Sequence, residues 1–169
     1  IFFTDSGPLG TTSLEHPTGS VYMASQLGGS NEQKGRFVLQ PLLNQCLAHP
    51  SGIAVDESGD VLYVAETMRN RVLRGVRIAG AFHFSVFRQF SGMVGPTCLA
   101  LSKKGNLVVG RMDGPKSPLG EVVVLNPKGA VLGTLSCPGS QVASLALDSA
   151  DKTLYVVAGT KVFRTPFKH

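Results

Sequence analysis

The sequence predicts an all-β protein of the β-propeller class, and a repeated phrase is the main reason. In each copy an apolar strand ends at a polar residue, a short turn follows, and a second apolar strand begins. The copies start at Ile53, Leu99 and Leu145, so neighbouring copies lie 46 residues apart. A repeat of about this length that consists of short strands is typical of propeller blades with four strands each. The chain of 169 residues therefore holds about three and a half blades.

The strands of the two complete blades follow from apolar segments that lie between turn-forming residues. We expect these blades at residues 49–92 and 93–138. The first hairpin turn is Glu57–Asp60, and the corresponding turn of the next blade, Lys103–Gly105, is one residue shorter. The expected strands are 52–55, 61–66, 71–78 and 81–90 in one blade, and 97–101, 107–111, 120–125 and 130–135 in the other.

Both ends of the chain predict incomplete blades. Residues 1–48 lack an inner strand, and residues 139–169 lack an outer strand. The expected strands are 1–5, 19–24 and 37–47 in the former, and 142–147, 154–158 and 161–166 in the latter. An incomplete ring exposes an apolar blade face and unpaired strand edges. We therefore expect a longer protein, in which the remaining blades of the same chain or a partner cover these faces.

The alternation of side chains along a strand predicts which residues pack between blades. Phe82, Phe84 and Val86 fall on the same side of their strand, and we expect all three to be packed between blades. Three small residues, Ala54, Ala100 and Ala146, occupy equivalent positions of the inner strands. We expect tight packing there, because the inner strands lie closest to the propeller axis.

Composition narrows the class of protein further. Hydrophobic residues make up 43% of the chain, but no stretch approaches the roughly 18 apolar residues of a membrane helix. We expect a water-soluble chain; this segment carries no targeting pattern, so its compartment stays open. The net charge is +5, yet only 16% of the residues are charged. Cys46, Cys98 and Cys137 form no metal-binding pair, and we expect Cys46 and Cys98 to be buried reduced thiols because both sit in apolar strands.

Several phrases carry a resemblance to known propeller families. His49–Asp56, followed by Leu62–Thr67 and Asn70–Val72, resembles the NHL repeat and also the strictosidine synthase-like and regucalcin/gluconolactonase superfamily. The wider pattern, which includes Phe2–Ser6 and Gly120–Gly129, is more similar to the second group. The resemblance implies a six-bladed propeller, of which this chain is similar to blades two to five.

The same resemblance implies where a metal ion would lie. Enzymes of that superfamily mostly hold calcium or zinc in the central channel, on an Asn or Asp just before an inner strand and on a Glu of the first blade. The matching positions here are Ser51 and Thr97, and Gln141 stands near the third. Hard cations need oxygen donors, preferably charged ones, whereas Ser and Thr hydroxyls are neutral. We expect no metal and no cofactor on this segment, and calcium or zinc only if the complete family site exists elsewhere.

One carboxylate and one basic run are the remaining candidates. Glu66 ends a strand near the blade opening, where a general acid or base is conceivable, although such a residue more often pairs with an arginine. The basic rim consists of Arg69, Arg71, Arg74 and Arg77. NHL-type propellers can bind RNA through such a face, but Arg71 and Arg77 point away from Arg74, and no aromatic residues are interleaved. Solvated, salt-bridging arginines are the preferred interpretation, and nucleic acid is not an expected partner.

No catalytic set is recognisable in the sequence. The four histidines lack metal-ligand spacing, and the nucleophile motif Gly-x-Ser-x-Gly is absent. Three functional hypotheses remain. The first is a binding or scaffold propeller that has lost the family's metal ligands. The second is a small-molecule enzyme of strictosidine synthase or lactonase type, whose catalytic residues lie outside this segment. The third is an NHL-like module that binds RNA or a protein.

Overall fold

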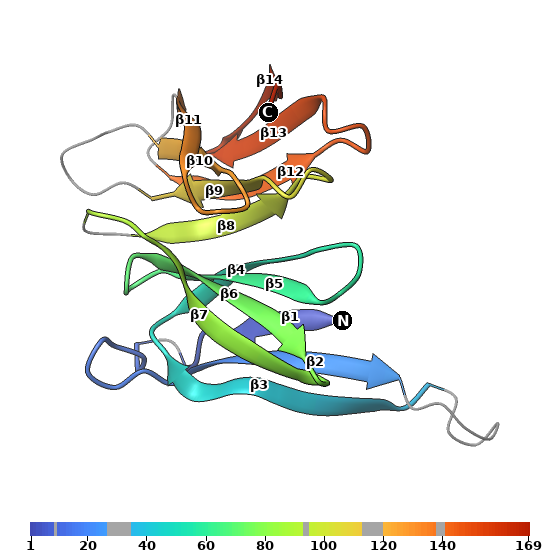
Figure 1. Cartoon of the computed structure of the whole chain (residues 1–169). Helices are drawn as coiled ribbons and strands as arrows, with labels where there is room; N and C mark the ends of the chain where they lie inside the picture. Colours follow the sequence, from blue (N-terminus) through green and yellow to red (C-terminus); the bar gives the residue numbers. More distant parts are fainter. Residues whose placement is uncertain (9, 27–34, 93–94, 113–119, 138–140) are drawn as a thin grey trace. The chain divides into compact units, whose positions relative to one another are not determined.

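The computed structural model describes residues 1–8, 10–26, 35–92, 95–112, 120–137 and 141–169. Fourteen strands of this part form four antiparallel sheets (Figure 1). The chain divides into two compact units, Ile1–Pro50 and Ser51–His169. Within the described residues, no helix has the length and apolar character needed to span a bilayer. The predicted all-β class is therefore confirmed.

The first unit is a single three-stranded sheet. Its strands β1 (Phe2–Asp5), β2 (Gly19–Gln26) and β3 (Phe37–Leu47) lie in the order β1-β2-β3. Phe3 and Tyr22 pair across the first two strands, and their rings stack with centroids 5.4 Å apart. At Gly19 a Cβ atom would lie 2.2 Å from the ring of Pro50, so a side chain at this position would clash with the proline.

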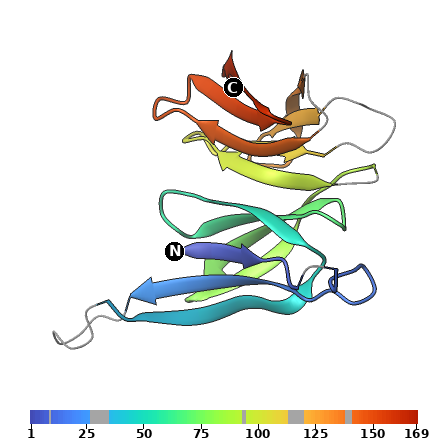
Figure 2. The ribbon, with the colours of Figure 1, turned by 180° about the vertical axis from the view of Figure 1, so that it is seen from behind.

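The second unit contains three sheets stacked face to face (Figures 1 and 2). Along each sheet the strands follow the chain order. The first sheet comprises β4 (Pro50–Val55), β5 (Val61–Glu66), β6 (Arg71–Ile78) and β7 (Ala81–Gln89). The second comprises β8 (Pro96–Leu101), β9 (Leu107–Arg111), β10 (Gly120–Leu125) and β11 (Val131–Cys137). The third comprises β12 (Val142–Leu147), β13 (Thr153–Ala158) and β14 (Lys161–Pro166).

The hairpins between the first two strands of each of the second unit's three sheets share one construction. An oxygen of the residue after the first strand accepts backbone N–H groups across the turn, as in an Asx turn. Asp56 Oδ1 accepts from Asp60 and Val61, at 3.0 Å each, and Asp148 Oδ1 accepts from Lys152 and Thr153. In the shorter turn, Ser102 Oγ accepts a single N–H, from Asn106 at 3.0 Å. The one-residue difference predicted from the sequence thus matches a shorter side chain at the start of the turn.

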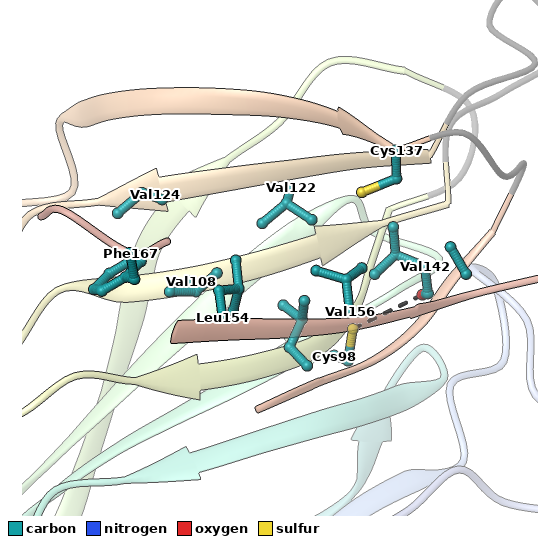
Figure 3. Close-up of a cluster of buried hydrophobic side chains, with 11 residues drawn as sticks. Cys98, Val108, Val122, Val124, Cys137, Val142, Leu154, Val156 and Phe167 are labelled. Carbon is teal, nitrogen blue, oxygen red and sulfur yellow. Dashed lines mark hydrogen bonds between the residues drawn. The ribbon is translucent and has the colours of Figure 1, made fainter. Parts of the chain in front are cut away.

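Two apolar clusters hold the three sheets together. One lies between the sheets β4–β7 and β8–β11 and includes Leu99, Leu107 and Leu125. The other lies between β8–β11 and β12–β14 (Figure 3), and its members are Cys98, Val108, Val122, Val124, Cys137, Val142, Leu145, Leu154, Val156, Ala158 and Phe167. Burial raises the pKa of the Cys98 thiol to about 11, so this thiol is neutral at physiological pH. The buried free thiol expected at Cys98 is confirmed.

Two packing predictions are wrong, and a third concerns a sheet face that is open in this segment. Cys46 is exposed, because neighbouring residues of the long strand β3 are also exposed. Val86 is 50% exposed because it lies on the outermost strand of its sheet, although it pairs with the buried Leu73 of β6. The β6–β7 register shifts between Val72 and Leu73 and leaves Phe87 opposite no residue of β6, and the Phe87 ring contacts Tyr63 edge-on at 5.0 Å. Ala146 is exposed because it lies on the face of β12–β14 opposite to the apolar cluster.

Candidate functional site

The candidate site is the row formed by the starts of the inner strands β4, β8 and β12. Ser51 lies at the start of β4, Thr97 lies at the start of β8, and Gln141 immediately precedes β12. Hydrogen bonds connect these starts from sheet to sheet. The structure therefore brings the three sequence-predicted positions into one continuous row, although the residues are about one repeat apart in the chain.

The first link of the row is a chain of two hydroxyl groups. Thr67 Oγ1 donates to the carbonyl of Pro96 at 2.7 Å, and it lies 2.7 Å from Ser51 Oγ. A hydroxyl has one proton, so Thr67 accepts the hydrogen bond from Ser51. Gly95 makes this approach possible, because a Cβ atom there would lie 2.4 Å from the carbonyl oxygen of Thr67. The Ser51 hydroxyl is thus oriented by Thr67 of its own sheet, and Thr67 makes the contact with the next sheet.

The second link joins the second and third sheets. Thr97 Oγ1 lies 2.6 Å from the carbonyl oxygen of Val142 and 3.3 Å from that of Gly110. The Thr97 hydroxyl therefore donates its proton to the nearer acceptor, the carbonyl oxygen of Val142. Gly110 lies against the same link, since a Cβ atom there would fall 2.4 Å from Cys98 Sγ and 2.6 Å from a methyl group of Val142. The Thr97 hydroxyl therefore connects two blades through their backbones.

Gln141 completes the row with its backbone. Its carbonyl oxygen accepts a hydrogen bond from the N–H of Gly159 at 3.1 Å, and its residue surface is exposed. The backbone bond ties the start of β12 to the end of β13. Its amide side chain is the group of the row that is open to solvent.

The donors of this row do not fit a divalent cation. The two hydroxyls carry no charge, and each directs its proton to a protein oxygen. A calcium ion takes six to eight oxygen ligands and is bound in proteins largely by carboxylates. In the part of the chain that the structure describes, no group of three His, Cys, Asp or Glu side chains is arranged to hold a metal. The described residues at this row therefore lack the carboxylates on which a divalent cation depends.

Glu66, the candidate acid or base, is an ion-paired residue in the structure. It is fully buried at the end of β5, and it accepts hydrogen bonds from Arg69 Nη1 at 3.0 Å and Arg71 Nε at 2.6 Å. A third arginine, Arg77, lies 3.7 Å from Asp60. Arg74 is half-buried on β6, opposite Tyr63 of β5 and Ser85 of β7. The four residues of the predicted basic rim therefore do not present one continuous cationic face.

Sequence reasoning did not single out Thr67, although it is the central member of the hydroxyl chain. Its partners Ser51 and Pro96 are 16 and 29 residues away in the sequence. A hydroxyl residue directly after a buried apolar strand is a weak signal, because surface turns often begin in the same way. A systematic comparison of strand ends with the strand starts of the following repeat could have found it.

The comparisons with known proteins agree with this architecture. The strands and the stacked sheets define a partial β-propeller. The family model described as the SMP-30/gluconolactonase/LRE-like region matches residues 12–160, so the chain belongs to this family. Among curated protein sequences, none matches the chain.

Similar solved structures are found among proteins of different activity. A gluconolactonase from Xanthomonas campestris has a TM-score of 0.72 and 24% identity, over 99% of this chain and 53% of its own. A calcium-binding regucalcin from Agrobacterium tumefaciens has a TM-score of 0.65 and 19% identity, over 89% of this chain and 48% of its own. A structure of a nidogen/laminin complex has a TM-score of 0.67 and 18% identity, over 88% and 53%. The chain thus spans about half the length of these proteins.

Proposed function

We propose that this segment is part of a binding or scaffold propeller whose channel works without a metal ion. One observation carries the proposal. At the positions that the resemblance matches to metal ligands, Thr97 donates its hydroxyl proton to Val142 of the next sheet, and Ser51 donates to Thr67, which in turn bonds to Pro96 of the next sheet. They act as structural groups in the channel wall. The starts of the inner strands therefore offer a ligand or partner uncharged groups, including the exposed Gln141.

The propeller fold is compatible with such a role. The nidogen/laminin structure, in which two proteins form a complex, is similar to this chain at a TM-score of 0.67. The fold positions loops at the ends of the channel, and loops on a rigid scaffold commonly carry binding residues. We propose that a protein or small organic ligand is bound at this end of the channel.

The alternative function is that of a small-molecule enzyme of lactonase type. It is favoured by the similarity to the gluconolactonase, which extends over 99% of this chain but only 53% of that protein. In this alternative, carboxylates from the remainder of the protein would provide the catalytic and metal-binding groups. A strictosidine synthase-type condensation would likewise depend on residues outside this segment.

We propose that nucleic acid is not a partner of the arginine-rich strand. The guanidinium groups of Arg69 and Arg71 are paired with the buried Glu66, and Arg77 lies near Asp60. Phosphate binding depends on cations that can replace the counterions of the nucleic acid. Paired arginines are poorly suited to this exchange. This interpretation also disfavours the NHL-like RNA-binding hypothesis.

The test compares metal binding and hydrolysis in the full-length protein. Isothermal titration with calcium and with zinc is expected to show no binding, and hydrolysis of a sugar lactone is expected to stay at the uncatalysed rate with and without EDTA. The double variant Ser51→Asn/Thr97→Asp restores the family's donor types and is the matched control. We expect this variant to gain cation affinity if the rest of the protein supplies the glutamate. Stoichiometric metal binding by the unchanged protein, with lactone hydrolysis that EDTA abolishes, would establish the enzyme instead.

A further inference from the structure

A cavity lies between the sheet β4–β7 and the sheet β8–β11, and none of the three row residues Ser51, Thr97 and Gln141 lines it. It has a volume of about 450 Å³ and is lined by the end of β7 and by strands β9, β10 and β11. This volume falls within the range of about 300–1,000 Å³ that is common for small-molecule sites. The lining residues used below are Arg88, Phe90, Arg111, Glu121, Val123 and Val131.

Two arginines approach the same aromatic ring in this cavity. The guanidinium carbon of Arg111 lies 4.8 Å from the centroid of the Phe90 ring, and that of Arg88 lies 6.0 Å from it. Cations within about 6 Å of an aromatic face are attracted by the ring. Phe90 therefore holds two positive charges at one site, which is unfavourable unless anions balance them.

Only one of the two guanidinium groups has a carboxylate partner in the described part of the chain. Arg111, which is 8% exposed, pairs with Glu121 and also donates to the carbonyl of Ser91 at 2.6 Å. Arg88 donates from Nη1 to the carbonyl of Gly129 at 3.3 Å, and no described carboxylate forms an ion pair with it. The charged groups of the lining are two arginines and one glutamate. The cavity therefore has one positive charge in excess.

The remaining wall of the cavity is partly apolar. Val123 is almost fully buried and Val131 is 45% exposed, and both line the space that the arginines border. Ser91 and Thr134 add exposed hydroxyl groups at the same cavity. The lining thus offers one uncompensated guanidinium beside an apolar surface. A ligand that matches it has a single negative charge at one end and an apolar body.

We propose that this cavity binds a small monocarboxylic acid, with Arg88 as the residue that pairs with its carboxylate. A guanidinium presents a planar fork of N–H donors, which matches the two oxygens of a carboxylate. The apolar body of the ligand packs on Val123 and Val131. Glu121 neutralises the charge of Arg111, so the single carboxylate of the ligand balances the remaining charge, that of Arg88. The lining contains none of the residues Ser51, Thr97 and Gln141, so the proposal does not depend on the function proposed for them.

The experiment measures binding of hexanoate to the full-length protein by ligand-observed NMR, with hexanamide and inorganic phosphate as comparison probes. We expect saturable binding of hexanoate, no binding of the uncharged amide, and weaker binding of phosphate. The Arg88→Gln variant is expected to bind hexanoate about 10- to 100-fold more weakly, because a hydrogen bond to a charged group contributes about 1.5–3 kcal/mol. Arg164→Gln, which changes an exposed arginine on β14, is the matched control and should bind as the unchanged protein does.

Two further results decide the proposal. Arg88→Lys keeps the charge and removes the planar fork of donors, so its affinity for hexanoate should fall between those of the unchanged protein and Arg88→Gln. If Arg88→Gln does not fold, Arg88→Lys alone tests the contribution of the guanidinium. A melting curve shows whether each variant is folded. Equal binding of hexanoate and hexanamide would overturn the proposal, and so would unchanged affinity in both folded Arg88 variants. Phosphate binding tighter than hexanoate would replace the carboxylate assignment with a general oxyanion site.

Discussion

Thr97 has a structural role at the scale of a single residue, although the sequence resemblance matches it to a metal-ligand position. Its hydroxyl has one proton, and the carbonyl of Val142 lies 2.6 Å away on the next sheet. A substitution that removes this hydroxyl therefore removes a hydrogen bond between two blades. A residue that matches a family motif in position can therefore have a different task.

We expect Thr97→Val to lower the free energy of unfolding by about 1–2 kcal/mol, because the buried carbonyl of Val142 loses its hydrogen bond while the side-chain shape is kept. Thr97→Ser retains the hydroxyl and should lose less. Thermal and urea denaturation of the full-length variants measure the difference. A Thr97→Val variant as stable as the unchanged protein would show that the hydroxyl does not hold the two blades together, and would contradict its structural role.

The limits of sequence reasoning at this scale have a common cause. Ser51 and Thr97 could be located because the resemblance matches them to family positions and they lie 46 residues apart, and Gln141 stands near the third such position. The hydrogen bonds of Thr67 and Thr97 could not be predicted, because their acceptors belong to the next sheet. The cavity around Arg88 was missed for the same reason, since Glu121 and Phe90 meet only after two sheets have packed. Cys46 was misjudged because the apolar character of a strand does not reveal which face is covered.

At the scale of elements, the hairpins show how one residue type stabilises a repeat. The first residue after the inner strand is Asp56, Ser102 or Asp148, and each side chain accepts backbone N–H groups of its own turn. Asn126 does the same between β10 and β11, where its Oδ1 accepts from Lys128 and Ala130. The amide and the carboxylate are therefore interchangeable in geometry but differ in their response to pH.

This difference leads to a prediction about acid stability. The hydrogen bond from the N–H of Lys152 lowers the pKa of Asp148 below 3.8. The pKa of Asp56 is also lowered: slight burial raises it, but the hydrogen bonds from Val61, Ser58, Asp60 and Gly59 outweigh that effect. Because the folded pKa values are depressed, the carboxylates contribute stability above about pH 4, and this contribution is lost as the pH falls through the folded values.

We therefore expect the double variant Asp56→Asn/Asp148→Asn to lose less melting temperature than the unchanged protein between pH 5 and pH 2. Its amide oxygens, like that of Asn126, accept the same hydrogen bonds without titrating. Glu57→Gln removes an exposed carboxylate of the same turn that accepts no hydrogen bond from the described residues, and it serves as the control. A double variant with the same acid dependence as the unchanged protein would show that other carboxylates control the acid transition.

The elements themselves were the most predictable part of this chain. Strands β5, β6, β9, β10, β12 and β14 begin and end where the apolar segments and turns predicted them. These strands are bounded by strong turn signals, and most of them are buried on both faces or on one regular face. The bulge at Phe87 could not be predicted, because an inserted residue leaves the apolar composition of a strand unchanged and alters only its register.

At the scale of the whole molecule, the outward face of the sheet β12–β14 is the feature that calls for an explanation. Ala146 pairs with Tyr155, which is 39% exposed, and Val157 pairs with Val162, which is 69% exposed. The opposite face of the same sheet is part of the apolar cluster shown in Figure 3. A sheet with two apolar faces is typical of a blade that has a neighbour on each side. We therefore propose that another blade or a partner covers this face.

Leucine at two equivalent alanines tests this proposal in the full-length protein. Ala100 is partly buried against the cluster between sheets, so Ala100→Leu should lower the free energy of unfolding by about 1–3 kcal/mol through overpacking. Ala146 occupies the equivalent position on β12 but is exposed in this segment. If a blade or partner covers it, Ala146→Leu should destabilise the protein by a similar amount, whereas on an open face the effect should stay within about 0.5 kcal/mol.

Urea denaturation measures the free energy of unfolding of both variants, and we expect Ala146→Leu to show the larger of these two losses. A stable Ala146→Leu variant alongside a destabilised Ala100→Leu variant would mean that this face is open in solution, because the same added volume would then meet only water.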